Sequence, residues 1–176
     1  YIYGVVIRDN NIHHNSDNGV NTRFGDALVE GNCINNNNIG LSIFHLRNIV
    51  KNNFVYANKY NLVLDGKGHI IRDNRFLGID VTEASVDDDL STLPVKTDVG
   101  YSAYPYTEAV LSGNEFKYNK SLTNSPNREG LIWESNFPEI IFSWRPEGQD
   151  EDYGLGTKVK ANGKIWSWVK KDGRIY

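Results

Sequence analysis

The sequence predicts an all-β protein whose main part is a parallel β-helix with coils of about 21 residues, followed by a small antiparallel β-meander. One motif recurs five times: an apolar residue, two mostly polar residues, Asn, any residue and a second apolar residue. The motif asparagines lie 22, 21, 21 and 40 residues apart. No stretch shows the sustained 3.6-residue periodicity of an amphipathic helix. Short strands and tight turns at this period are typical of a β-helix, in which each coil stacks on the previous one.

The motif supplies two columns of asparagine, which we expect to be structural ladders. Neighbouring strands lie about 4.8 Å apart, so equivalent side chains of successive coils come into contact. An asparagine tolerates a left-handed backbone at a coil corner, and its amide both donates and accepts hydrogen bonds. The first column is Asn10, Asn32, Asn53, Asn74 and Asn114. The second column, five residues further on, is Asn15, Asn37, Asn58 and Asn119, with Ile79 in the fourth copy.

A second strand-like piece follows the motif in the first three coils, at residues 19–24, 40–45 and 61–66. Alternation along a strand assigns its side chains to an inner and an outer face. The residues predicted to face the core are Val20, Leu41, Ile43, Leu62 and Leu64. The outward column predicted beside them is Arg23, Phe44 and Asp65, a candidate sugar-binding strip.

Residues 77–109 interrupt the repeat and are predicted to project from the solenoid as a loop. The stretch is acidic, with Lys96 as its one basic residue, and it carries three tyrosines. Solenoid insertions project from one face and often carry binding function, and tyrosine rings and carboxylates suit sugars. The alternative is a solvated loop whose tyrosines cover the coil beneath it. The candidate carbohydrate-binding residues are Tyr101, Tyr104, Tyr106, Asp87, Asp88 and Asp89.

The sequence divides into β-helix coils at 1–142, a Gly-, Pro- and acid-rich linker at 143–156, and a C-terminal meander at 157–176. The dipeptides at 162–163 and 172–173 are Asn-Gly and Asp-Gly, which favour two-residue hairpin turns. Trp166 and Trp168 alternate onto one face and need a partner surface, which makes them further candidates for carbohydrate binding. A cap or an oligomerisation module is the simplest interpretation, since three short strands bury little alone.

Composition narrows the range of functions. The net charge of −3 leaves no basic footprint for nucleic acid, and no apolar run approaches membrane-spanning length. The single cysteine, Cys33, allows no disulfide within the chain, and we expect it to be a small buried thiol. No two histidines have metal-ligand spacing together with a third ligand, so neither a metal nor another cofactor is expected. The chain has no methionine and begins with Tyr1, which suggests a fragment of a longer protein.

The candidate catalytic residues are chosen only by their position on the outer face of adjacent coils. Glycosidases use two carboxyl groups, about 5–5.5 Å apart when they retain configuration and about 6.5–9.5 Å apart when they invert it. One coil step gives about 4.8 Å and two give about 9.6 Å, so a β-helix can build either pair. Asp65, Arg23 and Asp26 are the residues on which we expect such a site, if this chain carries one.

The Asn-x-apolar-x-x-Asn coils, over residues 4–79 and more loosely 109–137, resemble right-handed parallel β-helix proteins of the pectate-lyase-like kind. That group includes polysaccharide lyases, glycoside hydrolases, sugar epimerases and bacteriophage tailspikes, and this chain most resembles the C-terminal part of a tailspike. The resemblance implies a homotrimer on the virion tail, or otherwise outside the cell, that binds or depolymerises a bacterial surface polysaccharide. The alternatives are a monomeric secreted lyase, hydrolase or epimerase, and a non-catalytic β-helical adhesin or structural segment.

Overall fold

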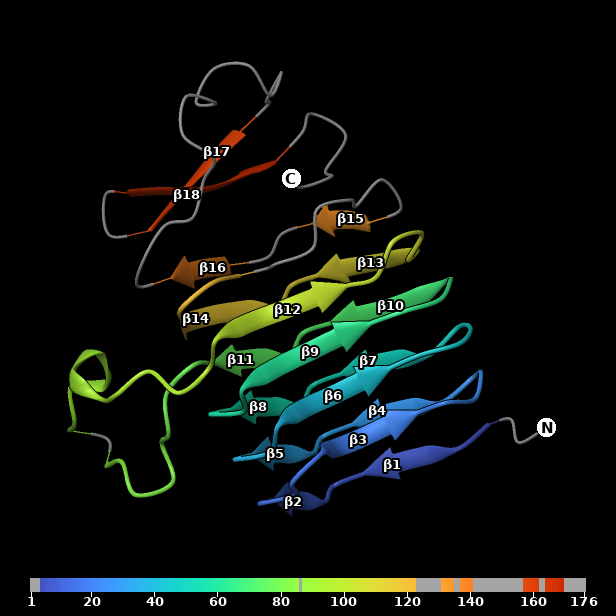
Figure 1. Cartoon of the computed structure of the whole chain (residues 1–176), viewed down its shortest axis with the longest axis horizontal. Coiled ribbons are helices and arrows are strands. Elements are labelled where there is room, and N and C mark those ends of the chain that lie inside the picture. Colours follow the sequence, from blue (N-terminus) through green and yellow to red (C-terminus); the bar gives the residue numbers. More distant parts are fainter. Residues whose placement is uncertain are drawn as a thin grey trace.

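The computed structural model describes residues 4–85 and 87–122 with their side chains, the Leu131 side chain, and the backbone of the strands at 131–134, 137–140, 157–161 and 164–169. Up to residue 140 these strands form a parallel β-solenoid, as the sequence predicts, and all pairings between its named strands are parallel (Figure 1). Regular coils of about 21 residues stack through residue 77. Register is kept because each strand pairs with the strand one coil earlier.

Three parallel sheets line the solenoid. Sheet one contains β1 (Val6–Arg8), β4 (Leu28–Glu30), β7 (Ile49–Lys51), β10 (His69–Arg72), β13 (Ala109–Ser112) and β15 (Leu131–Glu134). Sheet two contains β2 (Asn11–His13), β5 (Cys33–Asn35), β8 (Phe54–Tyr56), β11 (Arg75–Leu77), β14 (Glu115–Asn119) and β16 (Phe137–Ile140). Sheet three contains β3 (Asn18–Thr22), β6 (Ile39–Ile43), β9 (Tyr60–Leu64) and β12 (Val99–Ala103).

The core lies inside the three sheets and is built from aliphatic columns. In sheets one and two, from β1 to β14, one side chain near the middle of each strand points inward, as Val29 and Ile34 do. Phe76 and Phe116 stack at a centroid distance of 4.7 Å, two levels of the same column. The five predicted core residues of sheet three are all buried, which confirms the predicted alternation: Val20, Leu41, Ile43, Leu62 and Leu64.

The coil turns sharply at corners where one residue per coil adopts a left-handed backbone. Short polar residues and glycine suit this conformation, because other side chains crowd the following carbonyl. The corner between sheets one and two uses Asp9, Gly31, Asn52, Asp73 and Gly113, with φ between 55° and 66°. The corner between sheets two and three uses His14, Asn36, Ala57 and Tyr118. The third corner uses Asp26, Arg47 and Gly68.

The first asparagine column forms a continuous hydrogen-bonded ladder at the corner between sheets one and two. Each Oδ1 accepts from both the backbone N–H and the side-chain Nδ2 of the asparagine one coil earlier, at 2.9–3.1 Å. The Nδ2 of Asn53 also donates to the carbonyls of Val29 and Lys51, each at 3.0 Å. The amides thereby satisfy backbone groups that the turning chain cannot pair with itself.

The second column forms the same ladder only as far as Asn58. Asn15 bonds to Asn37, and Asn37 to Asn58, at 2.9 Å. The position after Asn58 is Ile79, which has no amide to offer. Asn61 of β9 fills the gap, because Asn58 Nδ2 donates to Asn61 Oδ1 at 3.1 Å and Asn61 Nδ2 donates to Asn119 Oδ1 at 3.0 Å.

A third, shorter ladder links Asn48 to His69. The Asn48 side chain accepts from the Ala27 N–H at 3.0 Å and donates to the Phe44 carbonyl at 2.6 Å. One coil later His69 repeats both roles, with Nδ1 3.3 Å from the Asn48 backbone nitrogen and Nε2 2.8 Å from the Asp65 carbonyl oxygen. This pattern assigns the neutral Nε2–H tautomer. Burial lowers the pKa of His69, against a smaller raising effect of Asp65.

The interruption of the repeat is shorter than predicted, because β12 is a regular strand of sheet three that pairs with β9. The loop that leaves the solenoid after β11 contains a 3₁₀ turn, η1 (Leu90–Thr92), and projects beyond the ends of β8 and β11 (Figure 1). Part of it contacts the outer face of sheet two. Its Val81, Leu93 and Val95 pack against that face. Cys33 belongs to the same cluster and is half-buried rather than fully buried.

At the C-terminal end, β17 (Thr157–Ala161) and β18 (Lys164–Val169) form an antiparallel hairpin. The three-stranded meander itself stays a prediction. The linker at 143–156 and the third strand, after residue 169, lie outside the described residues and stay predictions. Trp166 and Trp168 belong to β18, but their side chains are likewise outside the description, so their role in carbohydrate binding also stays a prediction.

Candidate functional site

A strip of side chains follows sheet three at the edge where its strands end. Phe44, Asp65 and Tyr104 come directly after β6, β9 and β12, and backbone hydrogen bonds of 2.9 Å hold Asp65 N to the Ile43 carbonyl and Tyr104 N to the Leu64 carbonyl. The Phe44 and Tyr104 rings lie 6.0 Å apart at an angle of 49°. Tyr104 is 50% exposed, whereas Phe44 and Asp65 are half-buried. The strip therefore presents one carboxylate at the coil level between two aromatic rings.

Arg23 extends the strip by one coil and is exposed. Asp26 lies at the next corner and makes two hydrogen bonds to Arg47, at 2.7 and 2.8 Å. The Arg47 guanidinium lowers the pKa of Asp26, because its hydrogen bonds outweigh the desolvation. Within residues 4–85 and 87–122, no hydrogen bond or ion pair joins Asp65 to Arg23 or Asp26. The strip brings Asp65 and Arg23 onto one column, but Asp26 is paired elsewhere.

The three tyrosines predicted to bind sugar differ in their exposure to solvent. Tyr106 is 84% exposed and Tyr104 is half-exposed, so both can reach a ligand. Tyr101 is fully buried in β12, where its ring packs 5.9 Å from that of Phe116. A ring inside the core cannot stack on a sugar, so the prediction for Tyr101 is wrong. It failed because β12 resumes the coil inside a stretch that looked like loop.

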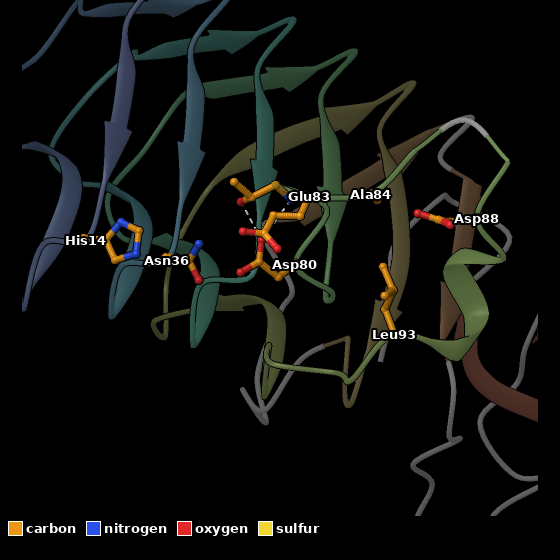
Figure 2. Close-up of a pocket in the computed structure, with 8 residues that line it drawn as sticks. His14, Asn36, Asp80, Glu83, Ala84, Asp88 and Leu93 are labelled. Atoms are coloured by element: carbon orange, nitrogen blue, oxygen red, sulfur yellow. Dashed lines mark hydrogen bonds between the residues drawn. The ribbon is translucent and has the colours of Figure 1, made fainter.

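A second candidate region is a hollow of about 450 Å³ between the insertion and the corner of sheets two and three. Figure 2 shows His14 and Asn36 on the solenoid side, with Asp80, Glu83 and Asp88 supplied by the insertion. The hollow is open, and most of the residues that line it have polar side chains, with Leu93 as the large apolar lining residue. Its complete lining is His14, Asn36, Asp80, Thr82, Glu83, Ala84, Asp88 and Leu93.

Asp80 is the anchor of the hollow rather than a free acid. Its carboxylate accepts from Lys96 Nζ at 2.6 Å and from the Thr82 hydroxyl at 2.6 Å, and Lys96 also reaches Asn36 at 3.3 Å. Partial burial opposes ionisation, but the hydrogen bonds from Lys96 and Thr82 outweigh it and hold the pKa of Asp80 far below its usual range. A carboxylate held ionised in this way fixes the insertion to the solenoid and is a poor proton donor.

The acidic run of the insertion mostly serves its own turns. Asp89 caps η1 by accepting from the Ser91 N–H at 3.0 Å, and Asp88 accepts from the Ser85 N–H at 2.7 Å. Hydrogen bonds from Ser91 lower the pKa of Asp89. Asp87 is exposed. A sugar-binding role for these three residues stays a prediction, and only Asp88 lines the hollow.

Sequence reasoning missed His14, Asn36 and Glu83 as neighbours. A signal exists for the first two, since both occupy the left-handed corner column and therefore project from the solenoid at adjacent coils. Nothing in the sequence places Glu83 against them, because the fold of the insertion decides that contact.

Comparison of the chain with protein-family models, with curated proteins and with solved structures finds no match. In the part of the chain that the structure describes, no helix is long and apolar enough to cross a membrane. The same part contains no group of three or more His, Cys, Asp and Glu side chains placed to hold a metal ion.

Proposed function

We propose that this chain is part of a tailspike-like protein of the right-handed, pectate-lyase-like class, and that it binds a bacterial surface polysaccharide on the strip of Arg23, Phe44, Asp65 and Tyr104. The observation that carries the proposal is that Asp65 lies on the coil between those of Phe44 and Tyr104, whose rings pack 6.0 Å apart on the column after sheet three. Such a protein acts on the virion tail or otherwise outside the cell.

The chemistry of the strip suits a sugar chain. Aromatic faces pack against the C–H faces of sugar rings, and a carboxylate accepts hydrogen bonds from their hydroxyl groups. Successive coils repeat the strip at about 4.8 Å, so the four residues extend over roughly 14 Å along the solenoid. A ligand that repeats along its own length, such as a polysaccharide, fits a surface built in this way.

Binding rather than cleavage is the function that we propose for the strip. Cleavage by a pair of carboxyl groups needs a second acid one or two coils from the first. Asp65 is the one acid of its column, and Asp26 is engaged by Arg47. A depolymerase activity of the whole protein would then use residues outside the strip.

Binding to an array of bacterial capsule and O-antigen polysaccharides tests the proposal. Once a bound glycan is found, we expect Tyr104→Ala and Asp65→Asn to weaken its affinity about tenfold or more, the loss expected for one desolvated polar or stacking contact. Glu83→Gln is the matched control, because Glu83 lines the hollow and not the strip. Loss of binding in Glu83→Gln, with Tyr104→Ala and Asp65→Asn unaffected, would move the site to the hollow and refute the strip.

We also propose that copies of the chain associate, as the resemblance to homotrimeric tailspikes implies. The supporting observation is an aliphatic column on the outer face of sheet one, where Val6, Ile49 and Ile70 are 55%, 37% and 40% exposed. A second copy offers a column of the same pitch, so aliphatic side chains can interlock coil by coil. The column consists of Val6, Leu28, Ile49, Ile70 and Val110.

Solution mass by light scattering tests this association. We expect the unaltered chain to be a trimer and Ile49→Glu to shift it toward monomer, since a charge would enter the centre of the column. Glu115→Gln, on sheet two, is the control. A monomer at all concentrations, or a trimer unaffected by Ile49→Glu, would contradict the assignment of this face.

A further inference from the structure

We propose that His13 and His14 form a two-histidine site for copper(II). His13 ends β2 and His14 opens the corner with a left-handed φ of 57°. In an extended strand, neighbouring side chains point to opposite faces. The left-handed turn cancels this alternation, so the two rings meet with their Nδ1 atoms 2.9 Å apart. Their planes are perpendicular, with centroids 5.1 Å apart.

The Nδ1–Nδ1 distance carries the chemical argument. Two imidazole lone pairs repel each other at 2.9 Å, so a proton or a metal ion belongs between the nitrogens. A metal bonded to both at about 2.0–2.1 Å with a right-angled geometry places them about 2.9 Å apart, whereas a tetrahedral metal needs roughly 3.3–3.4 Å. Right angles are the geometry of square-planar and tetragonal copper(II) and nickel(II) sites, and copper(II) binds nitrogen ligands most tightly of the divalent series.

The surroundings favour an open site of two protein ligands. Both histidines are exposed, so an ion reaches them directly. In the described part of the chain, no His, Cys, Asp or Glu completes a group of three around this point. Water fills the remaining coordination positions. His14 also lines the hollow, so the ion would lie at its margin (Figure 2).

Titration of the untagged chain with CuCl2 tests the proposal, by calorimetry and by electron paramagnetic resonance. We expect one copper(II) per chain at this site, with nitrogen hyperfine structure from two imidazoles. His13→Ala and His14→Asn should each weaken binding about tenfold or more, because a chelate loses one of its two ligands. Asparagine tolerates the left-handed backbone at position 14, so the second variant keeps the corner intact.

His45→Asn is the matched control, since His45 is also exposed and also left-handed, with φ of 76°, but has no histidine neighbour. We expect it to bind copper(II) as the unaltered chain does, and nickel(II) to bind the unaltered chain more tightly than zinc(II). Equal copper(II) affinity in the unaltered chain, His13→Ala and His14→Asn would overturn the proposal and leave the rings sharing a proton. A single-imidazole spectrum would overturn it as well.

Discussion

The two asparagine ladders run up neighbouring corners of one solenoid, yet they respond differently to the insertion. The first passes from Asn74 to Asn114 with the same two hydrogen bonds as in every coil below, although 40 residues separate these two asparagines. The second loses its regular rung at Ile79, next to the point where the insertion leaves the coil. The insertion therefore disrupts the asparagine ladders only at the corner where it leaves the coil.

The repair of the second ladder depends on the column beside it. In sheet three the positions level with Asn61 are occupied by Gly19, Gly40 and Gly100. A Cβ at Gly40 would lie only 2.7 Å from Asn58 Nδ2, so a side chain there is incompatible with an asparagine in the next coil. In the next coil Ile79 packs in the apolar cluster on the outer face of sheet two, and the Asn61 side chain makes the hydrogen bonds to Asn58 and Asn119 instead.

The largest effect is expected in the uninterrupted ladder, for Asn53→Ala. The variant leaves Asn32 without its acceptor and the Val29 and Lys51 carbonyls without their donor, all in a buried corner. We expect a loss of about 3–5 kcal/mol in the free energy of unfolding, from several buried groups left unsatisfied at once. Urea unfolding followed by far-UV circular dichroism measures it. A loss near zero would mean that the ladder adds nothing to stability.

Asn61→Gly should have a smaller effect, because it removes one bridge and no regular rung. We expect about 1–3 kcal/mol, since Asn58 Nδ2 and Asn119 Oδ1 each lose a buried partner. Urea unfolding followed by far-UV circular dichroism measures this loss, and a loss near zero would show that Asn61 is not a substitute for the missing rung.

The third ladder adds a pH dependence that the asparagine ladders lack. Burial holds the pKa of His69 below its ordinary value of 6.5, so the unfolded chain binds a proton more readily than the folded chain. This contribution to stability is complete above pH 6.5 and is lost as the pH falls through 6.5 toward the folded pKa. His69→Asn, which imitates Asn48, should flatten urea-unfolding stability over that window. His45→Asn, at an exposed site, is the control.

The smallest effect is expected at the ion pair of the third corner. Asp26→Asn keeps a residue that tolerates the left-handed backbone and removes only the charge facing Arg47. We expect no measurable change in the urea midpoint at physiological salt, because exposed ion pairs contribute little. A clear destabilisation would show that corner charges matter as much as corner amides.

The regular coils could be predicted because each residue has the same environment as the equivalent residue of the next coil. The first asparagine column, from Asn10 to Asn114, shows the same motif five times. Leu41 and Leu62 occupy equivalent inward positions in the apolar–polar alternation of two successive strands. Tyr101 was misassigned because no asparagine motif precedes β12 to set its register. The sequence contained a signal for the role of Asn61, because coils one and two have glycine at the equivalent position. That signal can be interpreted only once Ile79 is known to interrupt the second ladder. In the hollow the signal covered only His14 and Asn36, because the path of the insertion decides that Glu83 lines the same hollow.

Asn61 links Asn58 to Asn119, so the second ladder does not depend on the loop between Ile79 and β12. We therefore expect that this loop can be exchanged without changing the coils. Its anchors on the coils are local: Lys96 donates to Asn36, Thr82 pairs with Tyr56, backbone hydrogen bonds reach Gly78 and Lys59, and an apolar cluster rests on sheet two. A different loop that respects these anchors could be grafted onto the same exit without rewriting any coil. Proteins that must recognise changing surfaces gain from such an arrangement, because new recognition loops can be exchanged while the folding unit is inherited intact.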